Sequence, residues 1–336
     1  MIQEALARLV KKQDLSGDIM RQAQEEIMTG VARPEQIEGF LRGLREKGET
    51  VEEIAAAAEV MRRHATKIKS KEQFLLDTCG TGGDKAGTFN ISTISALVAC
   101  AAGIAVAKHG NKSVSSKCGS ADLLIELGVK IDLEPEKVEA CLAEIGFGFL
   151  YAPLLHRAMK YAMPVRKKMA VRTIFNILGP LTNPAGAACQ LLGVYDAQLT
   201  EVLARVLKSL GSKHVLVVHG EDGLDEVTTT AKTQIAELKD GQIKTYKISP
   251  ADFGLKQARP QDLKGGDIAF NATIAGEILK GKAGAQRDIV LLNAGCAIYA
   301  ANKVASIPEG ITQAAESIDS GRALEKLELL REFTNK

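Results

Sequence analysis

A glycine-rich stretch near residue 80 has the residue types of a phosphate-binding loop. It reads Asp77-Thr-Cys-Gly-Thr-Gly-Gly-Asp84 and continues through Thr88-Phe-Asn-Ile-Ser-Thr93. Glycine lets a backbone turn tightly and approach a ligand without a side-chain clash. The apolar run from Ser95 to Ala102 is typical of a helix, and the free N–H groups at a helix start attract anions. The sequence therefore predicts a phosphate site and an enzyme that handles a phosphorylated substrate.

Two familiar phosphate loops do not fit this stretch. A Walker A loop requires Lys after its second spaced glycine, but Thr88 follows Gly87. A dinucleotide fingerprint that begins at Gly80 requires glycine where Lys85 stands. Neither ATP hydrolysis nor NAD binding is favoured. A plain structural turn between a strand and a helix remains the alternative.

A second polar loop follows the next predicted strand, Ile104–Ala107. It extends from Lys108 to Asp122 and is rich in lysine and serine, with His109 and Asn111 near its start. The carboxyl ends of neighbouring parallel strands meet at one edge of a sheet. We therefore expect the two polar loops to converge on a single crevice.

An acidic segment follows a third predicted strand, His214–His219. Within it Asp225 and Glu226 are adjacent. Magnesium is typically held by one or two carboxylates together with substrate phosphates. A solvated acidic turn is the alternative, but the two phosphate-friendly loops favour a metal site. A basic segment between residues 161 and 183 adds Arg166, whose planar guanidinium can grip a carboxylate; a solvated helix-surface cation is the other interpretation.

The composition narrows the class of protein. The chain has 336 residues, of which 46% are hydrophobic, and its net charge of +2 indicates no strong attraction to nucleic acid or to an anionic membrane. Six cysteines contain no C-x-x-C pair, so we expect reduced thiols in a cytoplasmic protein. No apolar run is long enough for a membrane span.

Hydrophobic periodicity predicts how these loops are positioned. The first ~65 residues read as four amphipathic helices. From Phe74 onward strands and helices alternate, and Asp240-Gly241 predicts an antiparallel hairpin. We expect an α/β fold with a small N-terminal helical domain, residues 1–70, to which residues 163–184 return. Residues 71–336 are expected to form a large α/β domain with a mostly parallel central sheet.

Several of these motifs together resemble the anthranilate phosphoribosyltransferase family. The resemblance covers essentially the whole chain, with two mild departures, Lys112 where arginine is frequent and Cys118 where a small residue is frequent. The matching runs, in the family's order, are Asp77–Asp84, Thr88–Thr93, Lys108–Ser116, Gly119–Asp122, Arg172–Pro180 and His219–Glu226.

The resemblance implies a fold, a reaction and an assembly. The fold is like that of nucleoside phosphorylases. The reaction transfers the phosphoribosyl group of 5-phosphoribosyl 1-diphosphate (PRPP) to the amine of anthranilate and releases pyrophosphate, in tryptophan biosynthesis. A homodimer, a pair of magnesium ions per substrate-bound site, and no nucleic-acid or membrane partner are also implied.

The resemblance also assigns roles to residues. Lys108 and His109 are given catalytic roles, Lys108 toward the departing pyrophosphate and His109 in positioning anthranilate. The metal ligands are Ser92, Asp225 and Glu226. The anthranilate contacts are Gly80, His109, Asn111 and Arg166. The PRPP contacts are Gly80, Gly83, Asp84, Thr88, Asn90, Ile91, Ser92, Thr93, Lys108, His109, Gly110, Asn111, Lys112, Ser113, Val114, Ser115, Ser116 and Ser120.

Two other functions are compatible with parts of the pattern. A pyrimidine nucleoside phosphorylase would share the architecture and a related glycine loop, but it would not need the Asp225-Glu226 pair. A non-catalytic nucleic-acid-binding protein would need a strong basic stripe with exposed aromatic residues, and this chain has 4% aromatic residues and no Trp.

Overall fold

The computed structural model describes residues 1–113 and 117–336. The first 65 residues form the four predicted helices. Thr50 begins the fourth helix with a capping box, in which its side chain accepts from the Glu53 N–H and the Glu53 carboxylate accepts from the Thr50 N–H. Pro34 lies in the first turn of the third helix, as its fixed φ favours. These helices are α1 (Ile2–Val10), α2 (Gly17–Met28), α3 (Pro34–Lys47) and α4 (Val51–His64).

The central sheet of the described residues has seven strands. They are β1 (Leu76–Gly80), β2 (Val106–Gly110), β3 (Phe147–Tyr151), β4 (Cys189–Gly193), β5 (His214–Gly220), β6 (Thr233–Lys239) and β7 (Gln242–Ile248). Their order in the sheet is β3-β2-β1-β4-β5-β6-β7. The first five strands of this order pair in parallel and the last two are antiparallel, so the predicted α/β fold with a mostly parallel sheet is confirmed.

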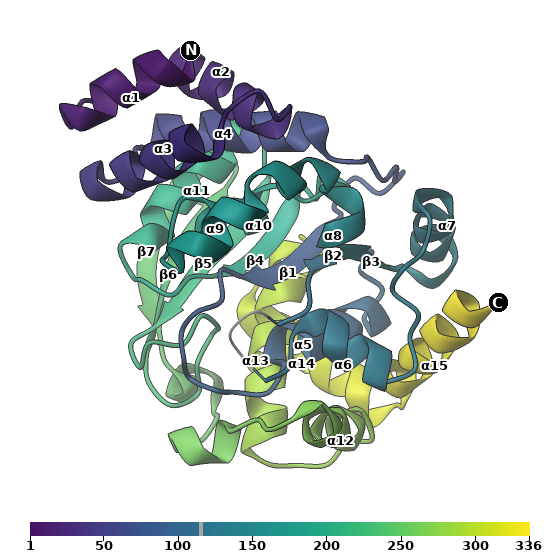
Figure 1. Cartoon of the computed structure of the whole chain (residues 1–336). Coiled ribbons are helices and arrows are strands. Elements are labelled where there is room, and N and C mark those ends of the chain that lie inside the picture. Colours follow the sequence, from purple (N-terminus) through teal and green to yellow (C-terminus); the bar gives the residue numbers. More distant parts are fainter. Residues whose placement is uncertain (114–116) are drawn as a thin grey trace.

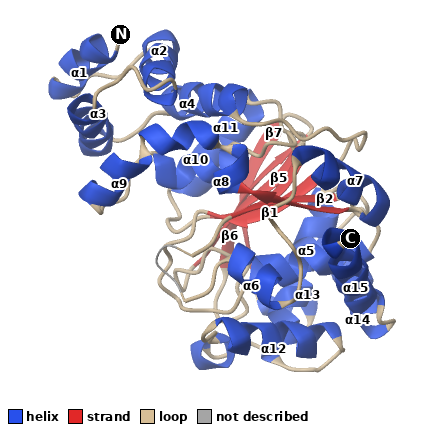
Figure 2. Cartoon of the chain, turned by 45° about the vertical axis from the view of Figure 1, so that its right-hand side comes forward, coloured by secondary structure: helices blue, strands red, loops and turns tan. Residues whose placement is uncertain are grey.

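Helices cover both faces of this sheet (Figures 1 and 2). The helices after β1 are α5 (Ile91–Ala101), α6 (Ser120–Glu126), α7 (Pro135–Ile145), α8 (Ala152–Leu155), α9 (Met163–Met169), α10 (Phe175–Leu181), α11 (Leu199–Ser209), α12 (Ile268–Leu279), α13 (Ala285–Ala300), α14 (Ile307–Asp319) and α15 (Arg322–Asn335). The helical bundle packs with α10 and α11 against one face, and α5 packs with the C-terminal helices against the other. No helix among the described residues is long and apolar enough to cross a membrane.

Three predicted boundaries were wrong. The first strand was expected from Phe74 onward, but the Phe74 side chain is 41% exposed and β1 begins at Leu76. Phe74 follows the polar residues 69–73 directly, and hydrophobicity alone does not separate an apolar residue beside a strand from the first residue of that strand. Helix α5 begins at Ile91 rather than Ser95, because Ile91 to Ile94, with two polar residues among them, form its first turn. The strand predicted at Ile104–Ala107 is β2, Val106–Gly110, so Lys108 and His109 lie in the strand and not in the loop that follows it.

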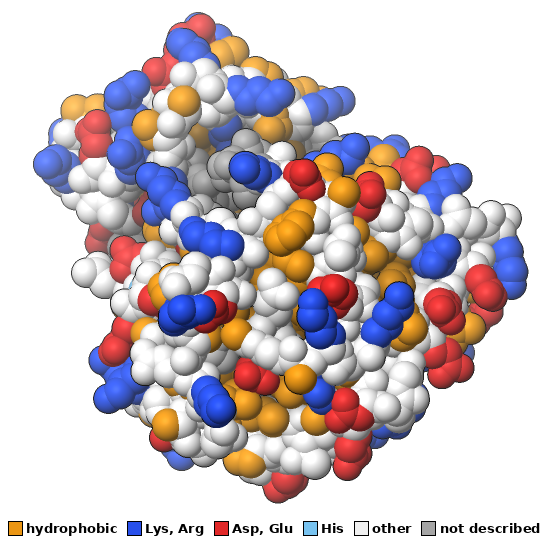
Figure 3. All heavy atoms as spheres, turned by 90° about the horizontal axis from the view of Figure 1, so that it is seen from below, with side chains coloured by type: hydrophobic (Ala, Val, Ile, Leu, Met, Phe, Trp, Pro, Cys, Tyr) orange, Lys and Arg blue, Asp and Glu red, His pale blue; other side chains and the backbone are white. Residues whose placement is uncertain are grey.

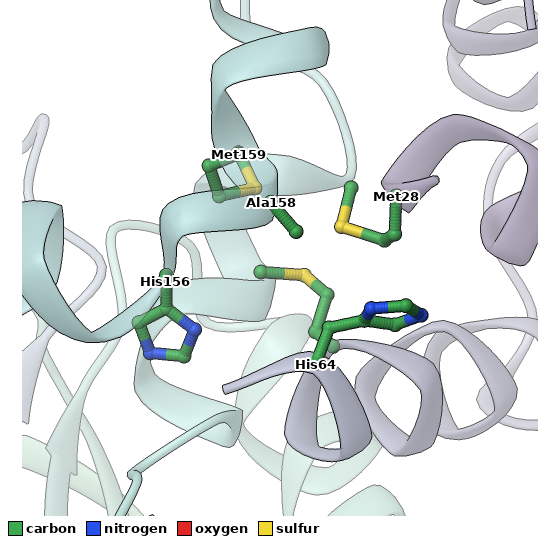
Figure 4. Close-up of a pocket in the computed structure, with 6 residues that line it drawn as sticks. Met28, His64, His156, Ala158 and Met159 are labelled. Atoms are coloured by element: carbon green, nitrogen blue, oxygen red, sulfur yellow. The ribbon is translucent and has the colours of Figure 1, made fainter. Parts of the chain in front are cut away.

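The chain returns to the helical bundle between β3 and β4. Helix α9 packs on α3, and Lys168 of α9 forms an ion pair with Glu38 of α3 at 3.0 Å. In Figure 4, His156 comes from this returning segment, whereas Met28 and His64 come from the bundle. These residues line a small pocket together with Met61, Ala158 and Met159.

Candidate active site

The two glycine-bearing strand ends lie where the strand order of the sheet reverses. Strand β1 has β2 on one side and β4 on the other, and Gly80 at the end of β1 is in register with Gly193 at the end of β4. In open α/β sheets, ligands bind in the crevice outside the carboxyl ends of strands at such a switch point. The geometry therefore places the predicted phosphate loop at the preferred position for a ligand.

The segment that carries Asp225 lies directly against these two glycines. A Cβ atom on Gly80 would stand 2.5 Å from Asp225 Oδ2, and one on Gly193 would stand 1.6 Å from the Asp225 carbonyl oxygen. A side chain at Gly193 would collide with the Asp225 backbone, and one at Gly80 would displace the Asp225 carboxylate. Gly193 was not found from the sequence; its signal was a glycine that ends an apolar run directly before Val194-Tyr195.

Asp225 and Glu226 are hydrogen-bonded to the glycine-rich loop and to the start of α5, respectively. Asp225 Oδ2 accepts from the Gly82 N–H at 2.7 Å, and Glu226 Oε1 accepts from the Ser92 N–H at 3.1 Å. Burial, and then the nearby Asp84 and Glu226 carboxylates, raise the pKa of Asp225 well above its usual range. Burial also raises the pKa of Glu226 to about 7, although Lys108 and the Ser92 hydrogen bonds oppose this shift. Carboxylates crowded in this way favour a cation between them.

Magnesium suits this donor set. Among the described residues, no group of three His, Cys, Asp or Glu side chains forms a ready-made metal site. Magnesium does not require such a cage, because it keeps several waters and takes substrate phosphates with one or two carboxylates. Asp225 and Glu226 offer those carboxylates, and the excess negative charge among Asp84, Asp225 and Glu226 is the structural sign of the fit.

Lys108 on β2 is 1% exposed and points toward the end of β1. Its ammonium donates to the Thr78 carbonyl and, at 3.4 Å, to Ser92 Oγ. Burial lowers the pKa of Lys108, while Asp77 and Glu226 act in the opposite direction. Lys108 is thus a buried cation beside the start of α5, where an anion would gain most from it.

His109 is buried next to Lys108. Its Nδ1 is 3.2 Å from the Gly179 carbonyl oxygen, so this nitrogen carries the proton and Nε2 is an acceptor. Nε2 has no hydrogen-bond partner among the described residues. Burial, and then the His156 ring at 4.9 Å, lower the pKa of His109 to about 3. The neutral ring therefore offers a free acceptor to a ligand that donates an N–H.

The start of α5 carries the predicted residues Asn90 to Thr93. Asn90 is the N-cap but its side chain forms no cap hydrogen bond; it bonds instead to the Cys118 carbonyl and to Asn271. Thr93 Oγ1 is buried without a partner among the described residues. The N–H groups of Ile91 and Ser92 already donate to the Phe89 carbonyl and to Glu226, and those of Thr93 and Ile94 donate to the Asn90 carbonyl. The unpaired Thr93 hydroxyl is therefore the donor that the start of α5 can offer to a phosphate oxygen.

The second polar loop leaves β2, the neighbour of β1 in the sheet, and hydrogen bonds within the loop and the start of α6 hold it. Ser120 Oγ donates to the Asn111 carbonyl, and the Asp122 carboxylate accepts from Ser113 and Gly119 N–H groups at 2.9 Å. Lys112 donates its N–H to Asn111 Oδ1. The predicted contacts Val114, Ser115 and Ser116 lie outside the described residues.

Two further predicted residues, Thr88 and Arg166, make separate contacts. Thr88 forms an isolated antiparallel bridge with Lys264. Arg166 on α9 packs over the Phe175 ring at 5.2 Å, and burial lowers its pKa. No carboxylate of the described residues forms an ion pair with Arg166, so its charge is available to an anion. The structure records no contact between Arg166 and His109, which share the predicted anthranilate role.

One buried node was not found from the sequence. Asn183 Nδ2 donates at 2.8 Å both to Asp77 Oδ2 and to the Ala107 carbonyl, and Asp77 Oδ1 accepts from the His109 N–H. Asp77 thus joins β1, β2 and the segment after α10. Only its first position in the glycine-rich run hinted at a role.

Comparison with known proteins identifies relatives over almost the whole chain. The helical bundle domain of the Glycosyl transferase family matches residues 3–65, and the a/b domain of the same family matches residues 72–324. Anthranilate phosphoribosyltransferase of Alkaliphilus metalliredigens is 54% identical, over 98% of this chain and 97% of the relative. The Desulfosudis oleivorans enzyme of that name is 53% identical over 99% of both chains.

Solved structures are similar over the whole chain. The anthranilate phosphoribosyltransferase of Thermus thermophilus superposes with a TM-score of 0.94 at 42% identity, covering 99% of both chains. The Saccharomyces cerevisiae enzyme, in complex with PRPP and Mg, gives a TM-score of 0.91 at 29% identity, covering 99% of this chain and 98% of that one. With these relatives and both matched domains, the chain belongs to the anthranilate phosphoribosyltransferase family.

Proposed function

We propose that this chain transfers the phosphoribosyl group of PRPP to the amine of anthranilate, giving N-(5-phosphoribosyl)anthranilate and pyrophosphate in tryptophan biosynthesis. The observation that carries the proposal is the convergence of the glycine loop, the Lys108–His109 strand end and the Asp225-Glu226 couple at one switch point. A yeast relative binds PRPP with Mg, and another structure of it holds 4-fluoroanthranilate.

The proposed PRPP site follows the anionic character of the substrate. The glycine loop supplies backbone N–H groups, and Thr93 and Lys108 supply an unpaired hydroxyl and a buried cation. Phosphate oxygens satisfy such donors. The proposed contacts are Gly80, Gly83, Asp84, Thr88, Asn90 to Thr93, Lys108 to Ser113 and Ser120, with Val114, Ser115 and Ser116 as further candidates.

We assign Ser92, Asp225 and Glu226 to magnesium, a pair of ions being bound when PRPP is present. Ser92 already lies beside Glu226 and Lys108, so its hydroxyl is close to both carboxylate and cation. When bound, magnesium neutralises charge on the diphosphate as it departs. Turnover that is independent of the magnesium concentration would contradict this assignment.

Anthranilate carries a carboxylate and a neutral aromatic amine, and the proposed residues match each group. Arg166 is a cation without a carboxylate partner among the described residues, and it is assigned to the substrate carboxylate. His109 Nε2 is a buried acceptor, and it is assigned to the amine N–H. Gly80 and Asn111 complete the proposed contacts.

The chemistry requires little proton transfer before the bond forms. The amine nitrogen attacks C1 of the ribose as the C1–O bond to pyrophosphate breaks, through an oxocarbenium-like transition state. An aromatic amine is neutral near pH 7, so positioning and charge neutralisation contribute most. Lys108 stabilises the departing pyrophosphate, and neutral His109 holds the amine in line.

The domain organisation, assembly and location are parts of the same proposal. Residues 1–70 with the return segment 163–184 form one domain and residues 71–336 the other, supported by the packing of α9 on α3. Small-angle scattering with and without both substrates tests closure between them. A cytoplasmic homodimer is proposed from the family resemblance, and analytical ultracentrifugation measures its mass.

A fluorescence assay of anthranilate consumption, with PRPP and magnesium, tests the central proposal. Loss of anthranilate fluorescence that requires both additions is expected. Phosphorolysis of uridine or thymidine without anthranilate turnover would favour a nucleoside phosphorylase instead. Salt-dependent DNA binding would favour a nucleic-acid role, although Figure 3 shows basic and acidic side chains interspersed over the face in view.

A further inference from the structure

The glycine-rich loop after β1 is fixed at successive residues. The Thr81 N–H donates to the Gly193 carbonyl at 2.9 Å, and the Gly82 N–H donates to Asp225 Oδ2 at 2.7 Å. Thr81 Oγ1 accepts from the Tyr195 N–H at 3.1 Å. These partners lie at or beyond the ends of β4 and β5, so the sheet itself holds the first half of the loop.

The second half of the loop is held from a different part of the chain. Arg172, in the segment between α9 and α10, donates from Nη2 to the Gly83 carbonyl. Gly83 has φ +81°, and a Cβ atom there would lie 3.1 Å from Arg172 Nη2. The left-handed backbone and the close guanidinium therefore both favour glycine at this position.

Arg172 is itself oriented by an aromatic platform. Its guanidinium carbon lies 3.9 Å from the centroid of the Tyr195 ring. Tyr195 is anchored to the loop through Thr81, so Tyr195 and Arg172 close a circuit from Thr81 to Gly83. Stacking on an aromatic face while donating in plane is a property of arginine that lysine does not share.

We propose that Arg172, stacked on Tyr195, is a positioning residue that preorganises the glycine-rich loop for the diphosphate sugar. The inference rests on the proposed function and names the residue that readies its PRPP site. It acts through the Gly83 backbone and not on the reacting atoms. Three glycines in the four residues from Gly80 to Gly83 give the free loop many conformations. A loop that is already ordered does not lose that entropy when PRPP binds.

The proposal predicts a specific pattern of affinities. Arg172→Met removes the hydrogen bond and the stacking, and PRPP affinity should fall about tenfold, the order expected for one charge-assisted hydrogen bond. In Arg172→Lys the PRPP affinity should fall nearly as far, because lysine does not combine the forked donor geometry of a guanidinium with stacking on a ring. Tyr195→Leu should also weaken PRPP binding, whereas Tyr195→Phe keeps the ring and should bind normally.

Isothermal titration with PRPP and Mg²⁺ measures these affinities, and steady-state kinetics measures both substrates. Lys168→Met is the matched control, because Lys168 lies in the same segment but pairs with Glu38 of α3. The KM for PRPP should rise with Arg172→Met while the KM for anthranilate changes less than twofold. Unchanged PRPP affinity in Arg172→Met, or equal rises in both KM values, would overturn the positioning role.

Hydrogen exchange of the unliganded protein gives an independent test. The amides of residues 81–84 should exchange faster in Arg172→Lys than in the original chain, with the rest of β1 unaffected. Equal exchange would contradict the proposal even if a variant loses activity through partial unfolding. If the original chain neither binds PRPP nor consumes anthranilate, the proposed function itself is refuted. If the original chain binds PRPP and the Arg172 variants bind it equally well, only the Arg172 role is refuted.

Discussion

A histidine and a glutamate are buried at each end of the central sheet, but their hydrogen bonding differs. At one end, called the incomplete end below, polar groups lack partners within the described part of the chain; at the other, the complete end, the His and Glu side chains are hydrogen-bonded. At the carboxyl ends of the parallel strands lie His109 and Glu226; at the opposite end lie His214, the first residue of β5, and Glu237 of β6. His109 Nε2 has no partner among the described residues. His214 has a partner at each ring nitrogen, Asn302 Oδ1 at 2.7 Å and Glu237 Oε1 at 3.0 Å.

The carboxylates differ in the same way. Burial acts to raise the pKa of Glu237, but hydrogen bonds from His214, Tyr299 and Tyr246 outweigh it and lower the pKa to about 2. Glu226 is also buried, yet its pKa is raised to about 7 because its surroundings compensate its charge less fully. A buried polar network with every group satisfied stabilises a fold, whereas unsatisfied groups at a strand end mark where a ligand completes the network.

The largest expected effect concerns the incomplete end. The double variant Asp225→Asn with Glu226→Gln should lower kcat/KM by about 100-fold or more, because the charge that would hold magnesium is lost. Its Tm should not fall, since crowded buried carboxylates repel each other in the unliganded protein. Turnover measured across a magnesium titration tests the loss of kcat/KM, and thermal melts without ligand test the unchanged Tm.

Glu221→Gln is the control for the acidic segment. Glu221 is exposed and pairs with Lys247 at 2.6 Å, away from the glycine loop. It should leave both turnover and the magnesium requirement within twofold of the original. If Glu221→Gln and the double variant lose activity equally, the acidic segment does not act through Asp225 and Glu226.

The complete end should show the reverse pattern. Glu237→Gln removes the carboxylate that bonds to His214 Nε2 and that accepts from Tyr246 and Tyr299, so the free energy of unfolding at pH 7 should fall by about 3 kcal/mol. Activity per folded molecule should change less than twofold. Urea denaturation and the anthranilate assay measure these quantities, and a large loss of kcat with normal stability would place a functional role at this end of the sheet.

The sequence predicted the elements and the meeting of the loops better than it predicted the contacts between them. Helices of the bundle and the hairpin at Asp240-Gly241 follow local patterns of hydrophobicity and turn residues, and both are confirmed. The two loops meet because parallel strands end at one edge. The individual ligand roles remain predictions, to be tested by the variants above.

Contacts between distant segments had no local signature. Asp77 and Asn183 are 106 residues apart and meet only in the folded chain. Arg172 was named only as the first residue of a run that resembles the family, because its stacking on Tyr195 depends on how the return segment packs. Glu237 and His214 likewise lie in strands that read only as apolar or alternating runs, so their pairing was not expected from the sequence.

The dependence of stability on pH tests whether His156, near the incomplete end of the sheet, is neutral in the folded protein. Burial, and then Lys67, lower the pKa of His156, the neighbour of His109, from 6.5 to about 4. The folded state then binds fewer protons than the unfolded state, so this group's contribution is complete above pH 6.5 and is lost as the pH falls toward 4. Between pH 6 and 5 the original chain should lose about 1 kcal/mol more stability than His156→Asn. Urea denaturation at both pH values gives the difference, and an identical pH dependence would contradict a neutral buried His156.

The smallest expected effect probes how strongly the complete network is coupled. Tyr246 OH donates to Glu237 Oε2 at 2.9 Å, so Tyr246→Phe should reduce the free energy of unfolding by about 1 kcal/mol without changing activity. Tyr161→Phe, on a 39% exposed ring, is the control and should change stability little. In a Glu237→Gln background the same Tyr246 substitution should cost less, because the charged acceptor is already gone. Equal costs in both backgrounds would mean that Glu237 is not the acceptor that stabilises Tyr246, and the contrast between the two ends of the sheet would lose its basis.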